Sequence, residues 1–359
     1  MKALIVYASA GAGHQKAAEA LYEYLKDTRP DLQLKLVNIL DYTSKSFKLL
    51  YSKGYIYLIS KLPWVWYFFY RLSFLFSNNP VHFYLDYSNS LAFIDLLRNE
   101  KPEIVLSTHF LTSSVLTVFK KQKSCHNFRH IAIITDYNLH PFWVGRGVDL
   151  YIASCDYIKD ELLKRGVDGQ RIKVYGIPVS PRFYLSSDRK SLAQKLQADP
   201  LKFTILIITG AIGIGPIEQI VKALANDAQL LVVCGKNQRL YKRITQMKFT
   251  QVKPFPLINN VDELMSISDL VLTKAGGLTI TESLIKRLPI IFFASVPGLE
   301  TANADVINKY GAAFRAKSIA QIKEFIIALK SRPQVVKEMQ KNLNLLRKDD
   351  TLVKISGLL

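Results

Sequence analysis

Short runs of hydrophobic residues alternate with longer amphipathic stretches along most of the chain. Short continuous apolar runs are typical of buried parallel strands, and amphipathic stretches between them, such as 156–165, indicate βαβ units. The runs cover 4–8, 34–40, 104–106, 131–135 and 150–153 in the first half, and 203–209, 230–235, 270–273 and 290–294 in the second. The pattern therefore predicts an α/β protein of two doubly wound, Rossmann-like domains facing a cleft, with ligands at the carboxyl ends of the strands.

The region between the two sets of strands is typical of a linker. Residues 177–200 contain Pro178, Pro181 and several Ser and Asp residues. We expect one domain over 1–180, a second over 200–332, and a C-terminal helical segment over 333–359, where the chain is charged and leucine-bearing. A chain of 359 residues is long enough for two such cores.

The first expected strand leads into a small-residue loop. Gly11 and Gly13 bracket Ala12, and His14 stands where an amphipathic helix begins. A glycine turn at a helix N-terminus favours anions or brings the backbone close to a ligand. A tight turn without a ligand is equally consistent with this stretch taken alone.

Composition limits the classes of partner. The three cysteines are scattered singly, which favours reduced thiols over disulfides or a zinc site. The first expected strand starts at the N-terminus, so we expect no cleavable signal. The net charge of +19 suits nucleic acid, anionic lipid or anionic small molecules.

The distribution of charge favours a membrane surface. Residues 42–85 contain no Asp or Glu, and 55–76 form the densest aromatic cluster of the chain. The longest uncharged apolar run, 62–70, is far shorter than the roughly 20 residues that span a bilayer. We therefore predict a segment that lies on an anionic membrane surface. Its predicted contacts are Lys53, Lys61, Trp64, Trp66, Phe68, Phe69 and Arg71. The alternative is a helical pair that packs these aromatic rings into a core. Nucleic acid is disfavoured because the cations accompany bulky aliphatic side chains.

The second half contains its own phosphate-loop candidate. Gly210, Gly213 and Gly215 follow an expected strand and precede an expected helix. Glycines let a backbone approach an oxygen-rich ligand, and free helix-start amides meet its charge. The spacing is not GxGxxG, so a dinucleotide loop is disfavoured.

Two further loops carry polar side chains at expected strand ends. Gly276, Gly277 and Thr279 precede Glu282, whose carboxylate could accept hydrogen bonds from both hydroxyls of a ribose. A helix-capping role is the alternative for Glu282. Glu300 and Asn303 follow the next strand and could bind sugar hydroxyls. Together the three loops predict a nucleotide-sugar pocket.

These motifs resemble a known family. The stretches GAGH, TDYNLHPFW, TGAIGIGPIE, VVCGKN, TKAGGLTITE and PGLETAN are similar to those of the monogalactosyldiacylglycerol synthases and processive diacylglycerol glucosyltransferases. The peptidoglycan N-acetylglucosaminyltransferase is a more distant relative. The resemblance runs from Ala3 to about Ala316 and implies a GT-B fold of the glycosyltransferase family 28 type. The N-terminal domain would bind the acceptor, with Gly13 beside it, and the membrane. The C-terminal domain would bind a UDP-sugar.

The resemblance also assigns roles in the donor site. Glu282 would bind the ribose, Phe255 would lie by the uracil, and the loop 213–215 would meet the diphosphate. Glu300 and Asn303 would contact the hexose. Leu299 stands where the plant-type motif carries glutamine, so the resemblance does not fix which hexose is bound.

The expected reaction is inverting transfer of a hexose from a UDP-sugar to diacylglycerol or a similar lipid. His14, Asp136 and His109 are the candidate bases, and glycine-loop amides with Lys236 would stabilise the departing diphosphate. No DxD pair occurs, so we expect neither a metal nor another cofactor. We expect a peripheral enzyme on the cytoplasmic face of a membrane that does not bind nucleic acid. The alternatives are a soluble GT-B enzyme such as a nucleotide-sugar epimerase and a nucleic-acid binder without catalysis.

Overall fold

The structure is a computed structural model that describes residues 1–75, 81–122 and 125–359. The chain forms two compact units. Unit 1 comprises Met1–Pro181, Pro297–Leu299 and Asp350–Leu359, and unit 2 comprises Arg182–Val296 and Glu300–Asp349. The expected C-terminal segment therefore contributes residues to both units.

Unit 1 is built on a parallel sheet of six strands in the order β2-β1-β3-β4-β5-β6. Five of them match runs that the sequence predicts, and the short edge strand β6 was not predicted. The strands are β1 (Lys2–Tyr7), β2 (Gln33–Asn38), β3 (Ile104–Ser107), β4 (Arg129–Ile133), β5 (Leu150–Ala153) and β6 (Ile172–Val174).

Helices cover both faces of this sheet because successive side chains of a strand point to opposite faces. Leu4 and Val6 belong to a hydrophobic cluster with Leu97 and Leu116, whereas Ala3 and Ile5 belong to a second cluster with Leu21 and Ile355. The main helices of unit 1 outside the region 42–90 are α1 (Ala12–Thr28), α6 (Leu91–Glu100), α7 (Phe110–Phe119), α8 (Asp156–Lys164) and α17 (Thr351–Ser356). Short 3₁₀ turns occur at Ile39–Tyr42, Pro141–Trp143, Gly169–Arg171 and, where the chain passes to unit 2, Pro181–Tyr184.

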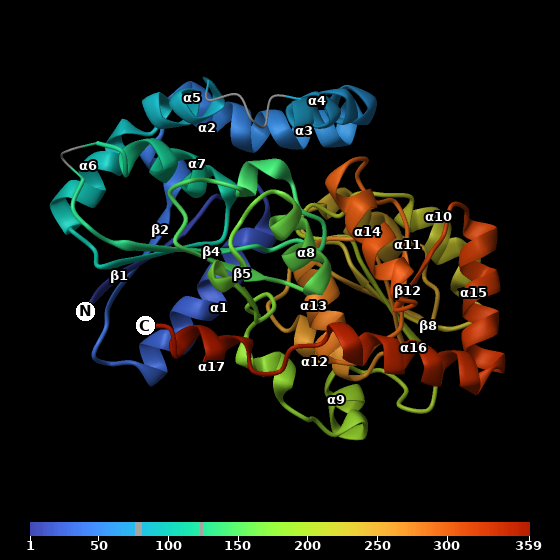
Figure 1. Ribbon diagram of the computed structural model, residues 1–359. Helices are drawn as coiled ribbons and strands as arrows, with labels where there is room; N and C mark the ends of the chain where they lie inside the picture. Colours follow the sequence, from blue (N-terminus) through green and yellow to red (C-terminus); the bar gives the residue numbers. More distant parts are fainter. Residues whose placement is uncertain (76–80, 123–124) are drawn as a thin grey trace. The chain divides into compact units, whose positions relative to one another are not determined.

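The region 42–90, which contains no Asp or Glu up to residue 85, forms its own helical layer. It contains α2 (Lys45–Leu49), a π-helical turn (Leu50–Gly54), α3 (Tyr55–Lys61), α4 (Pro63–Leu75) and α5 (Val81–Asn89). In Figure 1 these helices, in blue and cyan, lie along one side of unit 1. Phe76, the last residue of the aromatic segment, lies outside the described residues. Among the helices in the described part of the chain, none has the length and apolar character needed to cross a bilayer.

Unit 2 is also built on a parallel sheet of six strands, in the order β12-β11-β10-β7-β8-β9. Four of these strands fall in predicted runs, and β9 and β12 were not predicted. The strands are β7 (Thr204–Ile208), β8 (Gln229–Val233), β9 (Val252–Phe255), β10 (Leu270–Thr273), β11 (Ile290–Phe292) and β12 (Ala313–Arg315). Every residue of β7, β8 and β10 is buried, as their continuous apolar sequences require.

The helices of unit 2 bury apolar faces against this sheet. In α10, for example, Ile217, Ile220, Val221 and Leu224 recur at helical spacing and are buried. The helices are α9 (Arg189–Lys195), α10 (Ile217–Leu224), α11 (Gln238–Gln246), α12 (Val261–Ser266), α13 (Gly277–Ile285), α14 (Leu299–Lys309), α15 (Ile319–Ser331) and α16 (Pro333–Leu346).

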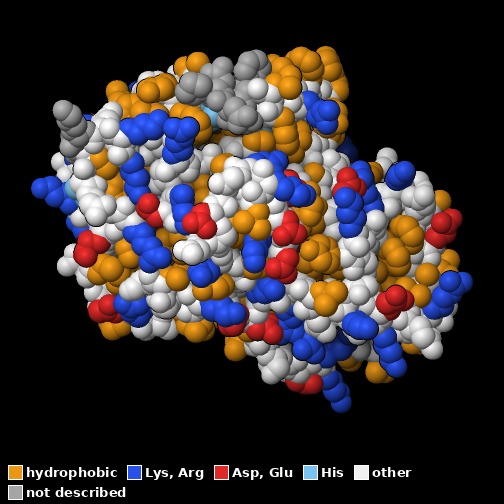
Figure 2. Space-filling model, in the orientation of Figure 1, with side chains coloured by type: hydrophobic (Ala, Val, Ile, Leu, Met, Phe, Trp, Pro, Cys, Tyr) orange, Lys and Arg blue, Asp and Glu red, His pale blue; other side chains and the backbone are white. Residues whose placement is uncertain are grey.

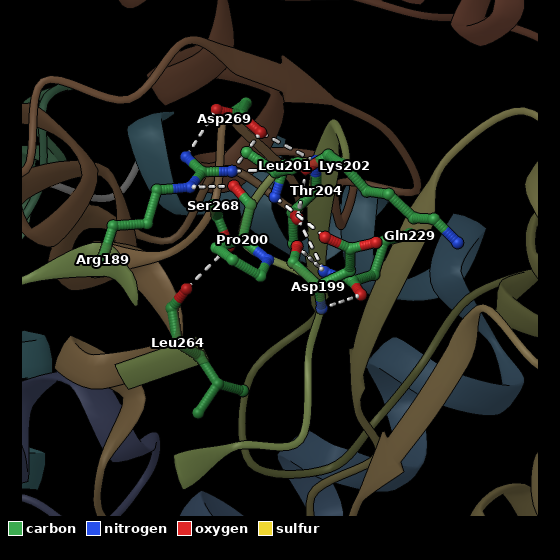
Figure 3. A network of polar contacts seen from close by, with 10 residues as sticks. All are labelled: Arg189, Asp199, Pro200, Leu201, Lys202, Thr204, Gln229, Leu264, Ser268 and Asp269. Carbon is green, nitrogen blue, oxygen red and sulfur yellow. Dashed lines mark hydrogen bonds and ion pairs between the residues drawn. The ribbon is translucent and has the colours of Figure 1, made fainter. Parts of the chain in front are cut away.

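The stretch expected as a linker contains α9, whose first residue ties it to the sheet. The guanidinium of Arg189 donates to both carboxylate oxygens of Asp269, at 2.7 and 2.8 Å. The same carboxylate accepts the Thr204 N–H at 2.8 Å (Figure 3). Asp269 and Thr204 lie at the amino ends of β10 and β7. This bidentate pair therefore stabilises the edge of the sheet opposite to the carboxyl ends, where ligands bind.

Candidate active site

The strand orders predict where ligands bind in each unit. In unit 1, β2 and β3 flank β1, and in unit 2, β8 and β10 flank β7. At such a point of the strand order, the connections after two neighbouring strands pass to opposite faces of the sheet. This leaves room for a ligand at the carboxyl ends of these strands. The switch point of unit 1 lies between the starts of α1 and α7, and that of unit 2 between the loops after β7 and β10.

His14 lies at the switch point of unit 1, in the first turn of α1, next to Gly13. Its Nδ1 is 2.8 Å from the carbonyl oxygen of Thr108 and 2.7 Å from the hydroxyl oxygen of Thr135. The Thr108 hydroxyl donates to the backbone carbonyl of His14 at 2.9 Å. A carbonyl only accepts, so Nδ1 carries the proton and the lone pair is on Nε2. This tautomer is the one that a general base requires.

The pKa of His14 lies below its ordinary value of 6.5. Burial is the main cause, and it outweighs the opposing effects of the Asp136 charge and of the hydrogen bond to Thr108. The imidazole is therefore neutral at pH 7 and can accept a proton.

His109 packs edge-on against His14, with ring centroids 4.6 Å apart. It is buried at the N-cap of α7, where its Nδ1 accepts the Leu111 N–H at 3.1 Å. Burial first, and then the neighbouring His14 and His140, hold the pKa of His109 well below 6.5. Its Nδ1 lone pair is used by the backbone, so the geometry favours a capping role for His109 and leaves His14 as the better base.

Asp136 follows β4 in the same region and is only 6% exposed. Its carboxylate is close enough to His14 to raise the pKa of that imidazole. Its backbone carbonyl accepts the Ser154 hydroxyl at 2.6 Å, which fixes the loop. This position suits a residue that stabilises the imidazolium once His14 has accepted a proton.

An aromatic cluster connects this region to α4. His140 Nε2 is 2.9 Å from the Ser73 hydroxyl, and its Nδ1 accepts the Phe142 N–H at 3.3 Å. Tyr70 and Phe74 pack against the same imidazole, with ring centroids 5.5 and 5.2 Å away. Both nitrogens of His140 are thus engaged, and burial lowers its pKa to about 4. His140 is a structural histidine that anchors α4.

The two faces of α4 differ sharply. Trp66, Tyr70 and Ser73, spaced about one turn apart, face unit 1, and Trp66 Nε1 donates to the Pro297 carbonyl at 3.1 Å. The opposite face exposes large apolar rings. Trp64 is 72% exposed, Phe68 59% and Phe69 52%. Lys53, Lys61 and Arg71 are exposed as well. Of the predicted membrane contacts, all but the half-buried Trp66 therefore lie at the surface, and Figure 2 shows hydrophobic side chains gathered over this layer. The alternative, in which the rings form a core, is wrong for these positions.

In unit 2, the loop after β7 is shaped by its glycines. Gly210 and Gly213 have positive φ, and a side chain on Gly213 would lie 2.2 Å from the Cys234 carbonyl. The Ala211 carbonyl accepts the backbone N–H of Lys236 at 2.8 Å, which joins the loop to the end of β8. Gly215 lies against Ala294 with little space for a side chain. These contacts fix the loop, in which Gly213 is buried and Gly215 is exposed. Free amides at such a position can bind a diphosphate, which stays the predicted role of the loop.

Lys236 lies in the loop after β8, and Phe255 is the last residue of the neighbouring strand β9. The Lys236 side chain is exposed, and Phe255 is half-buried at the end of β9, where its carbonyl accepts the Cys234 N–H at 2.8 Å. The role expected for Phe255, a ring beside the uracil, stays a prediction.

The loop after β10 opens α13. Gly276 is the N-cap and supplies no side chain, so the first amides of α13 have no side-chain cap. Gly277 is buried, Thr279 two residues later is half-buried, and Glu282, three residues after Thr279, is also half-buried. The roles expected for this loop in binding the diphosphate and for Glu282 in binding the ribose stay predictions.

Glu300 and Asn303 lie in α14 and contact the loop after β10. Glu300 pairs with Lys274, and its second oxygen accepts the Val296 N–H at 2.8 Å. Asn303 is fully buried, and its amide donates to the Ala275 carbonyl at 3.1 Å. We therefore expect Asn303 to position the loop. Lys274 was missed as a site residue, although it stands inside the TKAGGLTITE motif.

Each half of the chain matches a known protein family. Residues 14–179 match the family model for monogalactosyldiacylglycerol (MGDG) synthase, and residues 204–354 match that for the glycosyltransferase family 28 C-terminal domain. The processive diacylglycerol β-glucosyltransferases of Bacillus pumilus and Bacillus subtilis are each 28% identical over 351 residues, or 95% of this chain and 90% of theirs. An uncharacterized glycosyltransferase of Bacillus subtilis, YkoN, is 26% identical over 96% of this chain and 92% of its own.

Solved structures show the same fold at low sequence identity. MurG from Acinetobacter baumannii has a TM-score of 0.63 at 14% identity, with coverage of 99% of this chain and 98% of that one. The UDP-GlcNAc 2-epimerase of Neisseria meningitidis bound to UDP-GlcNAc has a TM-score of 0.62 at 15% identity, with coverage of 100% and 99%. Together with the two parallel sheets, these likenesses confirm the predicted GT-B fold.

Proposed function

Because the chain belongs to the family of monogalactosyldiacylglycerol synthases and processive diacylglycerol glucosyltransferases, we propose that it transfers a hexose from a UDP-sugar to a membrane lipid. The acceptor is diacylglycerol or a lipid with a similar free hydroxyl. One observation supports this above the others. Each matched half holds one of the two candidate sites at the switch point of its own sheet, His14 in 14–179 and the loops before Glu282 in 204–354.

The chemistry divides between the two sites. In unit 1 the acceptor hydroxyl attacks the anomeric carbon and gives its proton to Nε2 of His14. The bond between that carbon and the β-phosphate oxygen breaks, and its electron pair leaves with UDP. The loops of unit 2 bind the uridine and the diphosphate. A single displacement inverts the anomeric centre, so an α-linked donor gives a β-linked glycolipid.

The outer face of α4 supports a peripheral association with an anionic membrane. Exposed tryptophan and phenylalanine rings can lie at head-group depth, and Lys53, Lys61 and Arg71 can bind lipid phosphates. The inner face of the same helix contacts His140. Burial first, and then the nearby charge of Asp136, raise the pKa of Tyr70 on this face to about 12. The proposed membrane-facing segment and the proposed acceptor site thus belong to one packed region of unit 1. Attachment to the cytoplasmic face is part of the proposal.

The test of this function measures UDP release together with glycolipid formation. Purified protein is incubated with UDP-glucose, UDP-galactose or UDP-N-acetylglucosamine and anionic vesicles, with or without diacylglycerol. We expect UDP release that depends on diacylglycerol with at least one donor, and a matching amount of glycolipid. Release of UDP or epimerisation of the sugar without any lipid product would contradict the proposal and favour the epimerase alternative.

Membrane binding is tested separately by co-sedimentation with vesicles. The double variant Trp64→Ser/Phe68→Ser is expected to lose most binding. Leu201→Ser is the matched control because Leu201 is a 94% exposed apolar residue that does not belong to α4. Equal sedimentation of the double variant and the control would show that α4 is not the binding surface.

A further inference from the structure

Lys274 forms an ion pair at the switch point of unit 2 that the sequence-based site did not include. It directly follows β10, and its ammonium contacts Glu300, whose other oxygen accepts the Val296 N–H. The side chains are only 24% and 12% exposed. The partly buried ammonium is stabilised by this carboxylate partner.

The stem of Lys274 lies directly on the glycine loop. A β-carbon placed on Gly210 would be 3.1 Å from Cε of Lys274 and 3.9 Å from its Nζ. Gly210 also has a φ of +78°, which disfavours any side chain. The absence of a side chain at position 210 therefore leaves room for the lysine to cross the loop.

Lys236, the other lysine at a neighbouring strand end, is placed differently. Its backbone N–H holds the Ala211 carbonyl, but its side chain is exposed. Lys274 is half-buried against the loop and is held in place by Glu300. Of these two cations, Lys274 is the one prepositioned beside the expected diphosphate.

We propose that Lys274 is the cation that binds the diphosphate of the donor, and that Glu300 is its counter-ion while the site is empty. This inference rests on the proposed function. When a UDP-sugar binds, the ammonium of Lys274 turns from Glu300 to the phosphate oxygens. One carboxylate oxygen of Glu300 still accepts the Val296 N–H, and the oxygen that Lys274 has left can bind the hexose. As the glycosidic bond breaks, its electron pair goes to the β-phosphate oxygen, and the fixed positive charge of Lys274 stabilises that oxygen.

Calorimetric titration with UDP and with uridine separates the diphosphate from the nucleoside. We expect Lys274→Gln to weaken UDP binding about 10- to 100-fold, as for loss of a charged hydrogen bond, and to leave uridine binding unchanged. Lys274→Arg keeps the charge and should retain most of the UDP affinity. Lys222→Gln, an exposed lysine on α10, is the matched control and should bind both ligands as the wild type does.

Glu300→Gln is expected to change the UDP affinity in the opposite direction. It removes the anion that competes with UDP for Lys274, so UDP is expected to bind several-fold more tightly than to the wild type. Equal UDP affinity in wild type, Lys274→Gln and Glu300→Gln, with UDP still preferred over uridine, would overturn the inference while leaving the proposed function intact. Wild-type protein that binds neither ligand would instead contradict the proposed function.

Discussion

Asp86 lies on α5 of unit 1 and is only 8% exposed to solvent. Burial raises its pKa from 3.8 to about 7. An acid that holds its proton more tightly in the folded chain lowers the free energy of unfolding as the pH rises between its unfolded and folded pKa values. The range from 3.8 to about 7, at about 1.4 kcal/mol for each pH unit, corresponds to a loss of at most about 4 kcal/mol.

Asp86→Asn removes this loss because the amide does not ionise. Relative to wild type, the variant should therefore gain stability steadily from pH 4.5 to about pH 7, and the gain should level off above that pH. For a unit of this size each kcal/mol changes the melting temperature by about 2–4 °C, so a gain of several degrees is expected at pH 8.

Tryptophan fluorescence follows the melting of unit 1 alone, since the three tryptophans are Trp64, Trp66 and Trp143. Asp95→Asn is the control because the Asp95 side chain on α6 is 66% exposed; its difference from wild type should not vary with pH in this way. A difference between Asp86→Asn and wild type that stays constant from pH 4.5 to pH 8 would refute the reasoning.

The remaining predictions concern catalysis. His14→Ala should lower the turnover number by about 10²- to 10⁴-fold, the range for loss of a general base, with UDP affinity nearly unchanged by calorimetry; normal turnover would pass the role to Asp136 or His109. Because burial lowers the pKa of His14, wild-type turnover should fall on the acid side only below pH 6.5, as a pH–rate profile will show. Glu282→Ala should weaken the binding of both UDP and uridine, since its expected partner is the ribose, and an unchanged uridine affinity would exclude that contact. Dialysis against EDTA should leave turnover unchanged, and a loss restored by Mg²⁺ or Mn²⁺ would show that a metal assists the diphosphate.

Part of the fold could be predicted from the sequence, and the missed strands have a physical explanation. The buried strands β7 and β8 are continuous apolar runs and were predicted. In contrast, β6 and β12 have only three residues each, and β9 contains Pro254. All three lie at or next to a sheet edge, so they carry little of the apolar signal. The helix α9 was read as linker because Pro and Ser residues surround it.

The candidate site was predictable in its residues but not in its geometry. The glycine loops and His14 carry local signals. The bonds that set the tautomer of His14 join it to Thr108 and Thr135, 94 and 121 residues away along the chain. The Nδ1 contact that engages His109 as a cap likewise became visible only in the structure. Lys274 was overlooked although it stands inside the TKAGGLTITE motif, because the sequence does not show its ion pair with Glu300 or its contact with Gly210.

Mass spectrometry of the lipids after incubation with a UDP-hexose and diacylglycerol-containing vesicles is the most direct measurement of the proposed activity. We expect diacylglycerol to gain one or more hexose residues in the presence of wild-type protein, and far less in the presence of His14→Ala. Unmodified diacylglycerol with all three UDP-sugars, from protein that is folded and binds UDP, would contradict glycosyl transfer to this lipid.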